Sequence, residues 1–442
     1  TGPPGGLAPP ADGAEKGGGG DVNGNGNGGG RKREKKTTAD TECMTSSSAA
    51  EGPPSPLQDT FTKSSSVTVG NMSIRYACLS KRGRDPDDAT KPNQDCFGEH
   101  GRLFGGSGGG GGGGDSDAAF FAVYDGHGPK GDACSQYVKK RLPKLVKKHI
   151  EWLTVGGELS TGQVQAALHD AHLEVNSELR ASSVDDMTSG TTSVALFVHD
   201  SERRVTVSNV GDSRAVLGTK ARTVETRSGV QAVPLSNDHT PYRKDEAWRC
   251  VSKGARILSL GEIDPSPDDD DEEEVEDPPR VWAQDGKYPG TAFTRSIGDA
   301  IAEKFGVFAE PEMITLKISE DEKMVVLCSD GVFDVMSNQE VIDMCMEHED
   351  DPLAACSAVV SRSHEEWLKQ EDWEDEEGAN YDDMTIVCVF FDPPADADAA
   401  AEANGGEDED KLQIPPQAPV PRSERKRVRQ KTLTNLEEMG RS

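Results

Sequence analysis

Six aspartates of this chain stand where short apolar runs meet polar or glycine-containing turns. They are Asp95, Asp125, Asp212, Asp299, Asp330 and Asp382. If the apolar runs are neighbouring strands of one sheet, the carboxylates at their ends converge, and converging carboxylates repel one another unless cations bind them. Hard divalent ions such as Mg²⁺ and Mn²⁺ prefer oxygen ligands. The pattern indicates a carboxylate-rich metal site, while for any single aspartate a turn or a helix cap is the simpler interpretation.

The segments that must position these aspartates have the patterns of strands and helices. Short apolar runs rich in β-branched residues predict strands. These runs lie at 120–124, 192–198, 205–207, 324–328 and 384–391. Apolar residues repeat at helical spacing in 130–153, 163–180, 338–347 and 352–369. Because the helices come in pairs between successive strands, the order predicts an α+β fold of packed antiparallel sheets flanked by helix pairs, rather than alternating βαβ units.

The composition is strongly acidic. The 442 residues include 79 Asp and Glu against 48 Lys and Arg, a formal net charge of −31. Three runs, 262–277, 365–377 and 392–410, hold 27 of the acids and one lysine, so the rest of the chain is close to neutral. The excess of acid argues against a nucleic-acid partner, because binding phosphates takes clustered Lys and Arg. No run of 18 apolar residues exists, which argues against a transmembrane helix and a membrane partner.

Composition also predicts the domain boundaries. Segments rich in glycine or acid bury too little apolar surface to offset the entropy of ordering them. We therefore expect a disordered Gly/Pro-rich tail at 1–66, a folded domain at 67–393 and a disordered acidic-then-basic tail at 394–442. Inside the domain we expect a flexible glycine insert at 105–116 and an acidic insert at 262–279.

The cysteines and the basic runs bear on where the protein works. There are nine cysteines and no Cys-x-x-Cys pair, which indicates free, reduced thiols of an intracellular protein. Basic runs at 31–36 and 422–431 are typical of nuclear-localisation signals or patches for anionic partners, and solvated tail charge explains them equally well. We expect a monomer in the cytoplasm, the nucleus or both.

Seven short motifs together carry a family resemblance. They lie at 121–128 (Phe-Ala-Val-Tyr-Asp-Gly-His-Gly), 189–192, 210–214, 238–241, 294–299, 329–334 and 382–385. In this order they resemble the motifs of the metal-dependent Ser/Thr protein phosphatases of type 2C, across about 70–392. The stretch 290–303 is similar to a subgroup in which cyclic-nucleotide-binding and kinase domains follow the phosphatase. We expect either a fragment of such a protein or a stand-alone relative.

The resemblance implies a central β-sandwich flanked by helix pairs, with a dinuclear Mg²⁺ or Mn²⁺ site at one end. By this resemblance Asp125 bridges both ions and the carbonyl of Gly126 binds one of them. Asp330 and Asp382 complete the other ion's ligands, and Asp95 also matches a metal position. A third, weaker ion is implied at Asp212.

The resemblance also implies a reaction. A metal-activated water attacks the phosphorus of phosphoserine or phosphothreonine in phosphorylated proteins, and no cysteine takes part. His127 matches the general acid that protonates the leaving oxygen. Asp299 and Asp334 match positions that orient metal-bound waters from outside the ligand shell.

The chain departs from the family pattern at two positions. Gln94 stands where many relatives have Glu, and an uncharged amide is a weaker ligand, so we expect it outside the ligand shell. Thr90 stands where many relatives have the arginine that binds substrate phosphate, which leaves Lys91 or Arg84 to supply the positive charge. These departures keep a second hypothesis open, a catalytically weakened pseudo-phosphatase that acts as a regulatory binding module.

Overall fold

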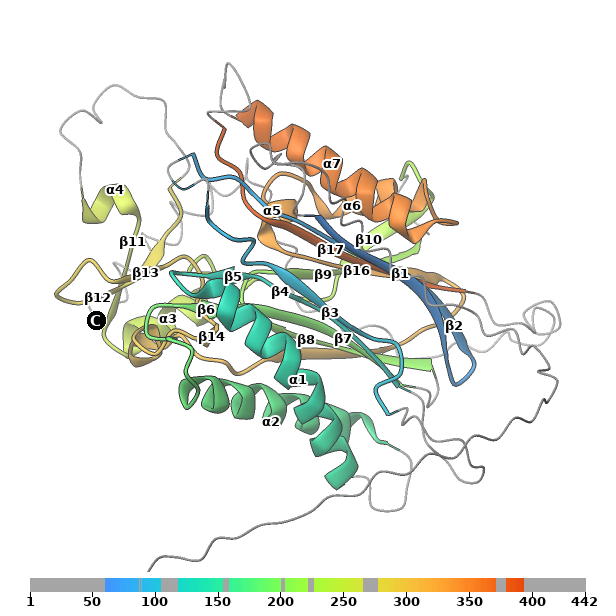
Figure 1. The fold of residues 1–442 in the computed structure, drawn as a ribbon, viewed down its shortest axis with the longest axis horizontal. Helices are drawn as coiled ribbons and strands as arrows, with labels where there is room; N and C mark the ends of the chain where they lie inside the picture. Colours follow the sequence, from blue (N-terminus) through green and yellow to red (C-terminus); the bar gives the residue numbers. More distant parts are fainter. Residues whose placement is uncertain are drawn as a thin grey trace, which may run out of the picture. The chain divides into compact units, whose positions relative to one another are not determined.

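Two antiparallel β-sheets lie face to face at the centre of the computed structural model (Figure 1). The first sheet has, in spatial order, β1 (Thr60–Val69), β2 (Met72–Lys81), β17 (Met384–Phe391), β16 (Glu322–Cys328), β9 (Arg214–Lys220) and β10 (Val230–Pro234). The second has β15 (Glu312–Lys317), β8 (Arg204–Val210), β7 (Ser193–His199), β4 (Ala118–Tyr124) and β3 (Cys96–His100).

The core of this sandwich comes from side chains of both sheets. One buried cluster includes Ile74, Phe121, Leu196, Leu217 and Val389, which lie on five different strands. Burying such side chains is worth roughly 1.5–3 kcal/mol each. All described residues belong to one unit of the chain. The structure describes residues 60–86, 88, 90–104, 118–153, 159–199, 203–221, 226–264, 277–370 and 379–392.

A pair of helices covers the outer face of each sheet (Figure 1). The helices α1 (Gly131–Leu153) and α2 (Thr161–Arg180) bury their apolar stripes on the five-stranded sheet. The helices α6 (Asn338–Met346) and α7 (Pro352–Gln370) do the same on the six-stranded sheet. Capping boxes begin α2 and α6. The predicted α+β sandwich with flanking helix pairs is therefore confirmed, and the four predicted helices match closely.

Two smaller three-stranded sheets complete the strand count among the described residues. One consists of β5 (Gly126–His127), β6 (Gly190–Thr191) and β14 (Ile297–Gly298). The other consists of β11 (Ala255–Leu258), β12 (Arg280–Ala283) and β13 (Pro289–Thr291). The β11-β12-β13 sheet shares a small apolar cluster with α3 (Lys244–Ser252) and the short helix η2 (Ala302–Phe305). The short helices α4 (Leu260–Ile263) and α5 (Asp330–Phe333) follow β11 and β16.

The predicted start of the folded domain at residue 67 was wrong. Residues 60–66, predicted to belong to the disordered tail, form the outer part of β1, which pairs with β2 along its whole length. Their side chains are exposed, so the sequence there lacks the apolar alternation that predicts a strand. The glycine insert 105–116, most of the acidic insert (265–276) and the tail 394–442 lie outside the described residues.

Two further observations concern the cysteines and the helices. The eight cysteines among the described residues are all buried and unpaired. Among the helices that the structure describes, none combines the length and the apolar character needed to cross a bilayer.

Candidate functional site

The register of the sheets brings five of the six strand-end aspartates to one end of the sandwich. In the five-stranded sheet Cys96 pairs with Tyr124. The next residues outward are Asp95 and Asp125, which therefore lie side by side.

The six-stranded sheet contributes three more carboxylates at this end. Cys328 at the end of β16 pairs with Ile386 on one side and with the first residue of β9 on the other. Asp330, Asp382 and Asp212 lie just beyond these paired residues. Five strands from the two sheets thus deliver one carboxylate each to this end.

The five carboxylates interact strongly. Burial raises the pKa of Asp125 well above its usual value, and the carboxylates of Asp330, Asp95, Asp382 and Asp212 raise it further. Burial and neighbouring carboxylates also raise the pKa of Asp330 and of Asp95. The same two causes raise the pKa of Asp212 to about 7. Bound cations relieve such repulsion, and a set of oxygen donors suits hard ions, so these residues fit Mg²⁺ or Mn²⁺.

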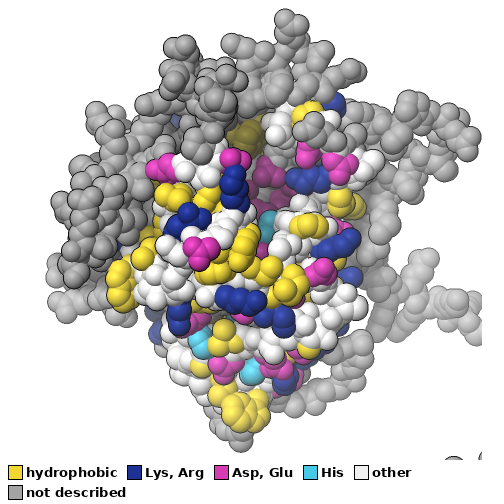
Figure 2. Space-filling view, turned by 90° about the vertical axis from the view of Figure 1, so that its left-hand side faces the viewer, with side chains coloured by type: hydrophobic (Ala, Val, Ile, Leu, Met, Phe, Trp, Pro, Cys, Tyr) yellow, Lys and Arg dark blue, Asp and Glu magenta, His cyan; other side chains and the backbone are white. Residues whose placement is uncertain are grey.

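Four of the five aspartates are partly or fully exposed, namely Asp125, Asp212, Asp330 and Asp382. Figure 2 shows a recess with acidic side chains at its bottom and a histidine beside them. Lys, Arg and apolar side chains surround the opening. Basic groups around an acidic floor suit a ligand that is itself anionic and is bound through cations.

Hydroxyl groups hold two of the aspartates, and sequence reasoning missed them. The hydroxyl of Ser329 donates to Oδ2 of Asp95 at 2.7 Å. The backbone N–H of Asp125 donates to Oγ1 of Thr192 at 3.0 Å, and Thr192 is hydrogen-bonded in turn to Ser213 at 2.7 Å. All three hydroxyl residues lie inside the motifs 189–192, 210–214 and 329–334, so membership of these motifs was the sequence signal that could have identified them.

Asp383, the residue after Asp382, and Gln94 hold the turns around the site. Asp383 accepts hydrogen bonds from the backbone N–H groups of Gly83 (2.6 Å) and Gln94 (2.8 Å). The side-chain amide of Gln94 donates to the carbonyl of Gly128 at 2.7 Å. A Cβ atom on Gly126 would lie only 2.6 Å from the carbonyl oxygen of Gln94, so glycine is required there. Gln94 thus supports the turn that carries His127.

His127 forms a hydrogen-bonded group with Asp299. Its Nε2 lies 2.6 Å from Oδ2 of Asp299, which also accepts a hydrogen bond from the hydroxyl of Ser296 at 2.6 Å. The ring packs against Phe293 with centroids 4.2 Å apart. A Cβ atom on Gly190 would lie 2.2 Å from Asp299 Oδ2, so the small β5-β6-β14 sheet needs glycine at this point. The sequence predicted Asp299 beside the metal waters, and it did not predict this contact with the histidine.

Asp334 and an unpredicted ion pair flank the carboxylates. Asp334 follows α5, and its carboxylate adds to the effect of burial in raising the pKa of Asp330 and of Asp212. The buried guanidinium of Arg214 makes a two-pronged pair with Asp238 at 3.0 and 2.6 Å. After burial, the carboxylate of Asp238 contributes most to raising the pKa of Asp212.

The two basic residues predicted to bind phosphate both lie beside Asp382. Burial and the neighbouring Asp383 raise the pKa of Asp382, and the ammonium of Lys91 opposes that rise. Arg84 exchanges two backbone hydrogen bonds with Tyr381, at 2.7 and 3.0 Å. Tyr381 directly precedes Asp382 in the chain. The structure therefore brings Lys91 and Arg84 to the same edge of the carboxylate cluster.

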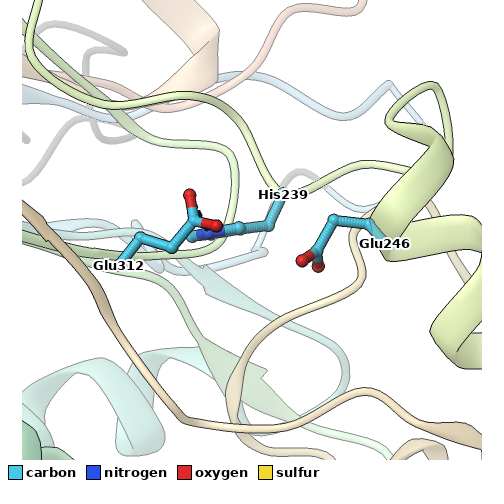
Figure 3. A group of neighbouring side chains, drawn as sticks. All are labelled: His239, Glu246 and Glu312. Carbon is cyan, nitrogen blue, oxygen red and sulfur yellow. Dashed lines mark ion pairs between the residues drawn. The ribbon is translucent and has the colours of Figure 1, made fainter. Parts of the chain in front are cut away.

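A second group of His and Glu side chains was not predicted. His239, Glu246 and Glu312 come from a loop, from α3 and from β15, and they point toward one another (Figure 3). The Nε2 of His239 lies 3.2 Å from Oε2 of Glu312. Its Nδ1 accepts a hydrogen bond from the backbone N–H of Gly211, next to Asp212, at 3.1 Å.

Arginines already neutralise this second group. Glu246 accepts hydrogen bonds from Arg249 at 2.6 and 2.7 Å, and from Arg295 at 2.7 Å. Arg243 makes two hydrogen bonds with Glu312, at 2.8 and 2.7 Å. Because guanidinium groups occupy the carboxylates, the arrangement is a buried ion-pair network rather than a cation site.

Comparisons with known proteins give the fold and the motifs a family context. Residues 93–366 match the family model described as Protein phosphatase 2C. The relative named Probable protein phosphatase 2C 35, from Arabidopsis thaliana, is 38% identical over 329 residues, which cover 73% of this chain and 85% of the relative. Probable protein phosphatase 2C 65, also from Arabidopsis thaliana, is 32% identical over 288 residues, covering 62% and 69%.

Solved structures show the same fold at lower sequence identity. A serine-threonine phosphatase 2C from Toxoplasma gondii superposes with a TM-score of 0.56 at 19% identity, covering 75% of this chain and 99% of that one. A sex determining protein from C. elegans superposes with a TM-score of 0.52 at 17% identity, covering 76% and 67%. These two likenesses concern the architecture alone.

Proposed function

Because the chain belongs to the protein phosphatase 2C family, and is thus a metal-dependent serine/threonine protein phosphatase, we propose that its reaction takes place at the carboxylate cluster around Asp125. The observation that carries the proposal is the convergence of five carboxylates whose pKa values rise together through burial and mutual repulsion. Its substrates are phosphorylated proteins, and the groups released are phosphate and the free serine or threonine.

The proposed metal ligands are side chains of different strands. Asp125 and the carbonyl of Gly126 would hold one Mg²⁺ or Mn²⁺ ion, and Asp330 and Asp382, together with Asp125, would hold a second. Asp95 lies next to Asp125 by strand register and would support the same ions. When bound, the ions lower the pKa of a water and neutralise phosphate charge. A third, weaker ion is proposed at Asp212.

His127 is the proposed proton donor. A serine or threonine alkoxide is a poor leaving group, so a proton must reach the oxygen as the P–O bond breaks. Asp299 lies 2.6 Å from Nε2 of His127 and Ser296 holds Asp299, so the imidazole has a fixed orientation. We assign Asp299 the role of positioning the acid, and Asp334 the role of orienting waters near Asp330.

The substrate phosphate meets positive charge at the edge of the cluster. Lys91 opposes the rise in the pKa of Asp382 and the backbone of Arg84 pairs with Tyr381, so either residue would supply positive charge at this edge of the cluster. Lysine offers a single point charge, whereas arginine offers a two-pronged contact. The predictions of a monomer in the cytoplasm or nucleus, without nucleic-acid or membrane partner, remain predictions.

The experiment measures phosphate release from a phosphothreonine peptide with Mn²⁺, Mg²⁺ or EDTA. We expect metal-dependent release by the wild-type chain, and a rate at least about a hundredfold lower in Asp125→Asn and Asp330→Asn, because each removes a charge at the point of catalysis. Asp170→Asn is the matched control, since this aspartate is exposed on α2.

Two results would contradict the proposal. Turnover without metal would remove the role of the carboxylates, and full activity of Asp125→Asn would place the reaction elsewhere. A wild-type chain that binds the phosphopeptide but releases no phosphate with either metal would favour the pseudo-phosphatase, the alternative that Gln94 and Thr90 suggested.

A further inference from the structure

The outer helix α7 makes direct hydrogen bonds to the turn that carries Asp330. The hydroxyl of Ser363 donates to the carbonyl oxygen of Gly331 at 3.0 Å. The indole Nε1 of Trp367 donates to the same oxygen at 2.7 Å. Ser363 and Trp367 are four residues apart, so they lie on one face of the helix. Two donors from one face thus fix the carbonyl that directly follows a proposed metal ligand.

The opposite side of Gly331 contacts the turn that carries Asp382. A Cβ atom on Gly331 would lie 2.0 Å from the carbonyl oxygen of Asp383 and 3.5 Å from Cβ of Asp382. The two ligand turns are therefore in contact across this glycine. A shift of Gly331 moves Asp330 and Asp382 relative to each other.

The same part of α7 also contacts the second ligand turn. The ring of His364 packs edge-on against Tyr381, with centroids 4.7 Å apart, and Tyr381 directly precedes Asp382. Three side chains of the same part of α7, Ser363, His364 and Trp367, thus contact both turns. Figure 1 shows α7 running along the six-stranded sheet, with α5 close to it.

The rest of α7 is anchored firmly, so the helix can act as a fixed support. Ala355, Cys356, Val359 and Val360 are buried in the cluster between the helices and the six-stranded sheet. The thiol of Cys356 lies 3.5 Å from the carbonyl oxygen of Ala77 in β2. A well-packed helix is a rigid support, and a metal site needs its residues held within about 0.5 Å of their working positions.

We propose that α7 positions the metal site: Trp367 and Ser363 hold Gly331 so that Asp330 and Asp382 keep the separation that a divalent ion needs. This inference rests on the proposed role of these two aspartates. Neither Trp367 nor Ser363 touches the ions or the substrate, so both are positioning residues. Their loss weakens metal binding in the absence of any substrate.

The test measures Mn²⁺ binding to the metal-free protein by isothermal titration calorimetry. Trp367→Phe keeps an aromatic ring at this position and removes the N–H, and Ser363→Ala removes the hydroxyl. We expect each variant to bind Mn²⁺ roughly threefold to tenfold more weakly, the change that loss of one neutral hydrogen bond produces. The double variant loses more than either single one.

The matched controls come from the same chain. Ser357→Ala removes a hydroxyl of α7 that bonds only within the helix, to the carbonyl of Leu353 at 2.8 Å. Trp152→Phe changes a tryptophan that is 75% exposed at the end of α1. Both should bind Mn²⁺ like the wild type. Thermal unfolding in EDTA then reports any loss of stability separately from the loss of affinity.

The outcomes separate this inference from the proposed function. If the variants unfold at lower temperature but bind Mn²⁺ as tightly as the wild type, α7 is merely structural and the inference is refuted. If the wild type binds no Mn²⁺, the proposed metal site fails and the inference falls with it. If the wild type binds Mn²⁺ but releases no phosphate, the proposed reaction fails while the role of α7 stands.

Discussion

Replacing Asp299 with asparagine tests whether this carboxylate orients the proposed acid. Asp299 Oδ2 lies 2.6 Å from His127 Nε2 and is 2% exposed, so the contact is short and shielded from water. Asparagine has the same shape but no charge. A hydrogen bond to a charged group contributes about 1.5–3 kcal/mol, which corresponds to roughly a 10- to 150-fold change in rate.

The assay compares two substrates that differ in their need for a proton. A threonine oxygen leaves as an alcohol and needs the proton from His127, whereas p-nitrophenolate leaves readily without one. Asp299→Asn should therefore lower kcat on a phosphothreonine peptide by roughly 10- to 150-fold and change kcat on p-nitrophenyl phosphate much less. His127→Gln should give the same pattern with a larger loss.

Equal losses on both substrates would refute the reasoning, because they would mean that Asp299 acts on the metals or on the fold rather than on the acid. Ser296→Ala provides the graded control. Its hydroxyl donates to Asp299 at 2.6 Å, so removing it loosens the carboxylate without removing the charge. We expect an intermediate effect with the same preference between the two substrates.

Two further predictions concern stability. Glu246 is 1% exposed and pairs with Arg249 and Arg295. Glu246→Gln should therefore lower the free energy of unfolding, measured by urea denaturation, by about 3 kcal/mol, while Glu151→Gln, at an exposed position, should change it little. An unchanged urea midpoint of Glu246→Gln would mean that the ion-pair network does not stabilise the fold. Burial and neighbouring carboxylates raise the pKa of Asp212 to about 7, so the folded metal-free protein binds more protons than the unfolded chain between about pH 4 and 7. Its melting temperature in EDTA should fall as the pH rises through this range, and saturating Mn²⁺ should reverse the trend, whereas a rise in EDTA would contradict the crowding of carboxylates.

The convergence of these aspartates was predictable because it depends on a local pattern. Each of Asp125, Asp330 and Asp382 borders an apolar run, and apolar runs of that length predict strands. That the strand ends meet followed from the resemblance to the family and from the expectation of neighbouring strands. In the structure, the register of β3 with β4 and of β16 with its two neighbours places these strand ends next to one another.

The contacts that hold the site were not predictable in the same way. Ser329 reaches Asp95 across 234 positions of sequence, and Gln94 meets Asp383 across 289. Nothing in the local pattern around a serine or a glutamine specifies such a partner, because packing of distant segments creates it. The start of β1 was missed for a related reason: its exposed Ser and Thr side chains show no burial pattern, and only pairing with β2 makes them a strand.

The long-range register has a consequence for how the protein becomes active during synthesis. The carboxylates at Asp95 and Asp125 emerge from the ribosome early, but their partners on β16 and β17 follow only near the end of the domain. β17 is also a central strand, paired with both β2 and β16, so the six-stranded sheet cannot close before it arrives. Contacts of such sequence separation slow folding, because the chain between the paired strands must first be brought together. The proposed metal site is therefore complete only once β17 has paired with β2 and β16, and we expect phosphatase activity only from then on.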